Sequence, residues 1–141
     1  ILPIEVGTAF STSVAGSVTA IRFYKGTGNT GTHTGSLWNS AGTRIAQVTF
    51  TNETATGWQT ATLPTPVALT PGATYVVSYY APNGRYSSTP AALTQSRTVG
   101  PLTAPGGANG RYRYGAGGGI PNRSWNSTNY FVDVRFRPAS P

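Results

Sequence analysis

The chain has 141 residues, a formal net charge of +7, no cysteine and no methionine, and only 9% of its residues are charged. This length suits one domain with its own core, and the absence of cysteine excludes a disulfide framework and thiolate metal sites. No apolar run is long enough to span a membrane, so we expect no membrane insertion. The positive charge favours an anionic partner, such as an acidic polysaccharide, an anionic surface or a nucleic acid.

The apolar clusters are short, rich in β-branched and aromatic residues, and bounded by Gly, Pro, Asn, Ser and Thr, a pattern that predicts strands. In chain order the expected strands are Ile4 to Phe10, Val18 to Lys25, Ser36 to Asn39, Arg44 to Phe50, Trp58 to Leu63, Val67 to Leu69, Thr74 to Ala81 and Tyr130 to Phe136. The second carries apolar residues on both faces, as a central strand covered on both sides would. Pro64 and Pro66 indicate a sheet edge or a crossing, because proline cannot donate to a ladder. Strands spaced by roughly 8–12 residues predict an all-β fold, a jelly-roll-like antiparallel β-sandwich.

The regular spacing stops at one long loop-rich insertion, residues 82–129, in which only Arg111 to Tyr114 reads as a short strand. Connections of that length are usually functional or disordered, and the aromatic residues here argue against disorder. We expect residues 1–137 to form a single β-sandwich module and residues 138–141 to form a linker-like tail.

Four long motifs carry a family resemblance: IRFYKGTGNTGTHTGSLW (21–38), FTNETATGWQT (50–60), TYVVSYYAPNGRYS (74–87) and YRYGAGGGIPNRSWNSTNYFVDVRF (112–136). They resemble the domain-of-unknown-function 4082 family of extracellular bacterial modules, often attached to glycoside hydrolases, polysaccharide lyases or immunoglobulin-like domains. The resemblance implies a secreted accessory module that binds glycans within a larger multidomain protein. Arg85 stands where histidine is common in the family, which affects ligand choice if this loop is the site.

Catalytic groups are scarce, with Glu5, Glu53 and Asp133 as the only acids and His33 as the only histidine. A glycosidase needs two carboxylates at a defined separation, and a serine hydrolase of the Gly-x-Ser-x-Gly type needs a motif that the chain lacks. We therefore expect no enzymatic activity.

Several polar and aromatic residues have a structural alternative. Asp133, between two valines, is expected to pair with Arg22 or Arg135. Glu53, with Asn52 beside it, could anchor a structural calcium ion, although one carboxylate makes a poor site and capping of the turn is the other reading. No other cofactor is expected. Trp38 and Trp58 lie among regular strand neighbours and are assigned to the core.

The ligand-binding hypothesis rests on aromatic faces that can stack on sugar rings and on polar groups that can bind hydroxyls or carboxylates. In Arg111 to Tyr114 the two-residue period places both tyrosines on one face and both arginines on the other. Either the tyrosine face is a stacking platform, or the tyrosines cover the sheet and only the arginines meet solvent. His33 could line a groove or satisfy backbone groups of its own loop. The expected ligand contacts are Tyr86, Tyr112, Tyr114, Trp125, Arg85, Arg111, Arg123 and His33.

The sequence thus predicts a non-catalytic, secreted carbohydrate-binding accessory module for a polysaccharide that could be acidic. The alternative is an extracellular structural or adhesive module, a stalk or self-assembling filament subunit with no small ligand. Arginine interleaved with aromatics also suits nucleic acid, but the extracellular setting that the resemblance implies favours a glycan.

Overall fold

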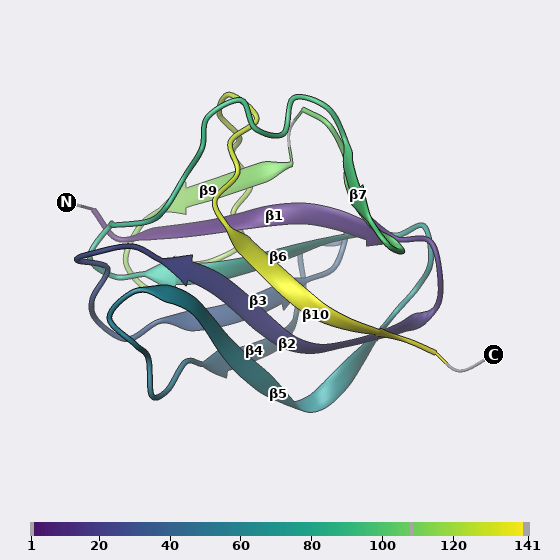
Figure 1. The fold of residues 1–141 in the computed structure, drawn as a ribbon, viewed down its shortest axis with the longest axis horizontal. Helices are drawn as coiled ribbons and strands as arrows, with labels where there is room; N and C mark the ends of the chain where they lie inside the picture. Colours follow the sequence, from purple (N-terminus) through teal and green to yellow (C-terminus); the bar gives the residue numbers. More distant parts are fainter. Residues whose placement is uncertain (1, 108, 140–141) are drawn as a thin grey trace.

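The computed structural model describes residues 2–107 and 109–139, and over these residues it forms ten strands and no helix (Figure 1). The strands are β1 (Ile4–Thr12), β2 (Gly16–Lys25), β3 (Thr34–Trp38), β4 (Arg44–Thr49), β5 (Gly57–Leu69), β6 (Thr74–Ala81), β7 (Arg97–Val99), β8 (Leu102–Ala104), β9 (Gly110–Tyr114) and β10 (Val132–Pro138). The described part of the chain therefore contains no helix that is long and apolar enough to cross a membrane.

Two antiparallel sheets make up the fold. The larger sheet has seven strands in the order β4-β3-β6-β1-β8-β7, with β9 paired to β1 beside β8, and the smaller sheet has the order β10-β2-β5. The prediction of an all-β antiparallel sandwich is confirmed. β2 is the central strand of the smaller sheet, as predicted, but its outer face is open to solvent, since Tyr24 on that face is 40% exposed.

The core lies between the sheets and follows the two-residue alternation of the strands. Ile4 and Val6 of β1 point inward, and Phe23 of β2 stacks on Tyr79 of β6 with ring centroids 4.1 Å apart. Phe50 meets the edge of the Phe23 ring at 4.8 Å. Each fully buried side chain of this size contributes about 1.5–3 kcal/mol relative to an exposed one, so these rings fix the two sheets against each other.

The two strands predicted around Pro64 and Pro66 form one long strand, β5. β5 is an edge strand, so the missing proline N–H groups cost no ladder hydrogen bond, and the register with β2 shifts between Val18 and Ala20. The prediction of a sheet edge at these prolines is confirmed, and the prediction of two separate strands is wrong.

The 82–129 segment contains more strand than expected, because β7 and β8 form a hairpin in addition to β9. β8 and β9 share the same edge of β1, with Thr103 opposite Ser11 and Tyr114 opposite Ile4. β10 packs across β6 and β1, so the β7–β8 hairpin extends the larger sheet past the edge of the smaller one. The segment before β7 and the segment before β10 both run over the side of the sandwich shown at the top of Figure 1.

The predicted tail begins inside the last strand. Pro138 is the final residue of β10, and the Ala139 N–H donates to the carbonyl of Ala15 at 2.9 Å. Residues 140 and 141 of the predicted tail lie outside the described residues.

Candidate ligand-binding site

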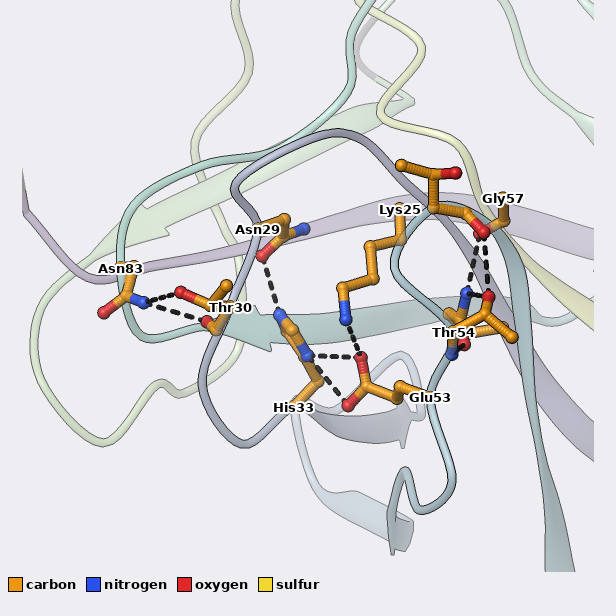
Figure 2. Close-up of polar contacts among 10 residues, drawn as sticks. Lys25, Asn29, Thr30, His33, Glu53, Thr54, Gly57 and Asn83 are labelled. Atoms are coloured by element: carbon orange, nitrogen blue, oxygen red, sulfur yellow. Dashed lines mark hydrogen bonds and ion pairs between the residues drawn. The ribbon is translucent and has the colours of Figure 1, made fainter.

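His33 lies at the centre of a buried polar cluster (Figure 2). Its Nδ1 is 2.8 and 3.0 Å from the two carboxylate oxygens of Glu53, and its Nε2 is 2.6 Å from Asn29 Oδ1. Lys25 Nζ lies 3.1 Å from Glu53 Oε1. In this arrangement both ring nitrogens face oxygen atoms of neighbouring side chains.

The cluster has a structural role, since the His33 side chain is 0% exposed. His33 joins the 26–33 loop to the 51–56 turn and cannot contact a ligand in this conformation. Its prediction as a ligand contact is therefore wrong for this conformation. Glu53 already faces two cationic or donor groups, Lys25 and His33, which disfavours a calcium ion there. Asn52 lies beside Glu53 in the exposed turn, and within residues 2–107 and 109–139 no group of three or more metal-binding His, Asp or Glu side chains occurs.

Arg85 and Tyr86, both expected contacts, do lie together. They line a pocket of about 200 Å³ whose other walls come from Gly26, Thr27, Asn29 and Gly84. The 26–33 loop and the 82–86 turn are tied by Asn83, whose Nδ2 donates to the carbonyl and to the hydroxyl of Thr30 at 3.0 and 2.6 Å (Figure 2). The pocket is therefore built between two connected loops.

The tyrosines of the predicted site form a cluster beside this pocket, but they do not form a flat platform. The rings of Tyr112 and Tyr114 lie 5.8 Å apart at an interplanar angle of 69°. Tyr112 is half-buried against the core, whereas Tyr114 is 52% exposed. Tyr86 packs on Tyr130 at 5.5 Å, and burial, followed by the neighbouring Tyr114 hydroxyl, raises the pKa of Tyr86. The tyrosine face of β9 is therefore neither fully exposed nor fully buried, because Tyr112 covers the core and Tyr114 meets solvent.

The remaining expected contacts are spread over the loops. Arg111 is half-buried and pairs in register with Gly7 on β1. Arg123 is joined to β9 through backbone hydrogen bonds with Tyr112 of 2.8 and 3.1 Å. Trp125 is 56% exposed on the loop before β10, where its carbonyl accepts from the backbone N–H and the hydroxyl of Thr128.

The glycine-rich segment after β9 covers a buried acid that the sequence analysis did not single out. Glu5 is 2% exposed, and Ser78 Oγ donates to its carboxylate at 2.6 Å while accepting from Trp38 Nε1 at 2.8 Å. Gly118 adopts φ +73°, and a Cβ there would overlap Glu5 Oε1. Burial raises the pKa of Glu5 to about 7, although Ser78 and the backbone of Gly119 partly offset it.

A larger cavity than this pocket lies elsewhere, along the β10 edge of the smaller sheet. This cleft has a volume of about 560 Å³, within the range of small-molecule sites. Its apolar lining comes mainly from both sheet edges and from the loops between them: Phe10, Leu93, Val99, Leu102, Phe131, Val132 and Val134. Larger and polar side chains also line it, among them Trp58, Arg97, Asn129 and Asp133.

Trp58 is 44% exposed, so its assignment to the core is wrong, whereas the assignment of Trp38 is correct. The Arg22 guanidinium lies over the Trp58 ring at 4.7 Å, and Tyr24 meets it edge-on at 5.7 Å. The exposure of Trp58 could have been predicted from the alternation of β5. Trp58 lies on the same face as Thr60 and Thr62, whereas Gln59, Ala61 and Leu63 point inward. A tryptophan in phase with threonines indicates the solvent face.

Asp133 lies directly opposite Arg22 in the β10–β2 register. Among the described residues, Asp133 forms no ion pair with Arg22 or Arg135, so the expected pairing is not formed. Its Oδ1 instead accepts from the Val134 N–H at 2.7 Å. The exposed Asp133 carboxylate is therefore available at the cleft.

The model of a family described as a domain of unknown function, DUF4082, matches residues 2–132. No curated protein and no solved structure shows a significant match.

Proposed function

The chain belongs to the DUF4082 family, and we propose that it is a non-catalytic, secreted carbohydrate-binding accessory module whose main glycan site is the cleft beside Trp58. The observation that carries the proposal is an exposed indole at the wall of a 560 Å³ cleft, with Asp133, Asn129 and Arg97 around it. This combination pairs an aromatic surface for the apolar face of a sugar ring with donors and acceptors for its hydroxyls.

The indole is held in place for such stacking. Arg22 lies against the Trp58 ring, and its Nε also donates to Thr60 Oγ1 at 3.3 Å. Tyr24 abuts Trp58, and Phe131 lies 6.4 Å from Tyr24, so a short row of aromatic rings crosses the outer face of the smaller sheet. A preorganised aromatic surface loses little side-chain freedom on binding, which favours recognition of a chain of sugars.

The polar residues of the cleft suit a neutral or an acidic polysaccharide. Asp133 accepts and Arg97 donates, whereas the Asn129 amide can do both. The surplus of ten basic residues over three acidic ones gives a net attraction for polyanions. Binding of an acidic glycan is therefore expected to weaken as salt is added.

Affinity electrophoresis of the chain in gels that contain neutral or acidic polysaccharides tests the proposal. At least one polysaccharide should retard the chain, and Trp58→Ala should weaken that binding by about tenfold or more, the usual scale for a central tryptophan. Trp125→Ala is the matched control, because it removes an indole that is at least as exposed as Trp58 from a loop outside the cleft. It should leave the retardation unchanged.

Two results would count against the proposal. Absence of retardation on every polysaccharide would remove the glycan function and leave the structural or adhesive module as the better reading. Loss of binding in Trp125→Ala with binding retained in Trp58→Ala would place the glycan elsewhere. Light scattering over a range of protein concentrations distinguishes the adhesive alternative, since a self-assembling module forms larger particles as concentration rises.

A further inference from the structure

We propose that the pocket between residues 26–29 and 84–86 is a second binding site that holds the carboxylate group of a uronic acid. The inference rests on the proposed glycan function and names acidic sugars as a ligand class. The site is separate from the cleft, since the two cavities share no lining residue. Arg85, Asn29 and Tyr86 supply its chemistry.

Arg85 carries a positive charge at the pocket without an acidic partner among the described residues. The chain has three acidic side chains, and none of them lines this pocket. Glu5 is buried against Ser78, Glu53 pairs with Lys25, and Asp133 lines the cleft. No acidic side chain within the described ranges pairs with Arg85, which is exposed at the pocket. A guanidinium presents two parallel N–H donors that match the two oxygens of a carboxylate.

The pocket wall also contains a buried donor, the side-chain amide of Asn29. Asn29 is 1% exposed, and its Nδ2 is buried without a hydrogen-bond partner among the described residues. The Tyr79 hydroxyl lies near the Asn29 amide, but the two groups do not form a hydrogen bond. Burial raises the pKa of Tyr79, and the nearby Asn29 amide partly offsets this rise. A buried N–H without an acceptor is unfavourable. We infer that a small outward movement of the pocket wall on binding lets a carboxylate oxygen reach and satisfy it.

The orientation of Asn29 is set by the buried cluster beneath the pocket. Asn29 Oδ1 is held at 2.6 Å by His33 Nε2, and the opposite ring nitrogen of His33 is held by Glu53. In Figure 2 the Asn29 oxygen points to the His33 ring and the amide nitrogen points away from it. The same cluster that buries His33, and so prevents it from contacting a ligand, therefore fixes the orientation of the Asn29 amide donor.

The pocket walls favour a sugar acid over a larger anion. A volume of about 200 Å³ admits one carboxylate and part of a sugar ring. The half-buried Tyr86 ring forms one wall and can cover the apolar edge of that ring. Gly28 allows the Arg85 side chain to lie across the loop, since a Cβ there would come within 3.3 Å of Arg85 Cδ. A single guanidinium with one amide suits one carboxylate better than the repeated phosphates of a nucleic acid.

Nuclear magnetic resonance titration of the ¹⁵N-labelled chain tests the inference, with D-glucuronate, acetate and D-glucose as probes. Glucuronate should shift the Asn29 side-chain amide and the Arg85 Nε–H signals saturably, with a Kd of about 1 mM, as one charged contact in an open pocket allows. Acetate should shift the same signals more weakly, and glucose should leave them unchanged. Added salt should weaken the glucuronate response.

Two variants should weaken glucuronate binding by about tenfold or more, the scale of one charge-assisted hydrogen bond. Arg85→Gln removes the cation. Asn29→Asp keeps an oxygen for His33 but replaces the donor with a negative charge, so a folded protein is expected. Arg137→Gln is the control: it removes the same charge at the opposite end of β2, where Arg137 pairs with Ser17.

The outcomes separate this inference from the cleft proposal. Shifts that persist in Arg85→Gln, or that glucose reproduces, would overturn the carboxylate site. Polysaccharide binding that depends on Trp58, with no glucuronate shifts at Asn29, would overturn this inference alone. A response to acidic peptides or single-stranded DNA that exceeds the response to glucuronate would replace the uronic acid by that ligand.

Discussion

Glu5 gives the sharpest test of the tertiary structure. Its carboxyl is buried beneath the glycine-rich segment, and burial raises its pKa from an ordinary 4.5 to about 7 against the opposing effects of Ser78 and Gly119. The folded state therefore binds this proton more tightly than the unfolded state, so stability should fall as pH rises from about 4.5 to 7 and then level off. A rise of this size corresponds to about 3 kcal/mol of unfolding free energy.

The Glu5→Gln variant should lose this pH dependence. Its amide cannot ionise, but the NH₂ group cannot accept a hydrogen bond as the hydroxyl oxygen of the protonated carboxyl group can. The variant should therefore lose about 1 kcal/mol at acidic pH through one hydrogen bond. Urea unfolding of both proteins at pH 5, 6, 7 and 8 gives the difference in unfolding free energy at each pH. The variant should be the less stable protein at pH 5 and the more stable at pH 8. A difference that stays constant across this range would refute the assignment of a raised pKa to Glu5.

Two further stability predictions concern buried charge and backbone conformation. Glu53→Gln should lower the unfolding free energy by about 3 kcal/mol in urea titrations, because Lys25 and His33 lose their shared carboxylate in a mostly buried site; a loss below about 1 kcal/mol would show that solvent screens the cluster. Gly118→Ala should cost more than Gly117→Ala in the same measurement. Both glycines have positive φ, +73° for Gly118 and +83° for Gly117, but only a Cβ on Gly118 would meet other atoms. Equal losses of unfolding free energy would contradict the close approach of Gly118 to the carboxyl group of Glu5.

The strands could be read from the sequence because their signals are local. In TYVVSYYA and VTAIRFYK, β-branched and aromatic residues between turn formers specify β6 and β2 within a few residues of their observed ends. The β7 and β8 strands were missed because each has only three residues, too few to establish an alternating pattern. Their pairing with each other and with β1 makes them strands.

The candidate site was only partly predictable. Arg85 and Tyr86 are neighbours in the chain, so their joint presence in one pocket follows from the sequence, whereas Asn29 reaches it only through the fold. The cleft joins Trp58 to Arg97 and Phe131, residues separated by more than thirty positions. No spacing rule connects such residues, because their meeting depends on how the two sheets are stacked and where the smaller sheet ends.

The sequence by itself determined an antiparallel β-sandwich, a positive charge and a shortage of catalytic groups, because periodicity and composition are properties of the chain. The tertiary structure decided which face of each strand meets solvent. Alternation defines two faces for Trp58 and for Tyr112, but the opposing sheet selects the buried one, leaving the first exposed and the second packed against the core. It also placed His33 and Glu5 in the interior, where burial and fixed partners, rather than residue type, set their roles.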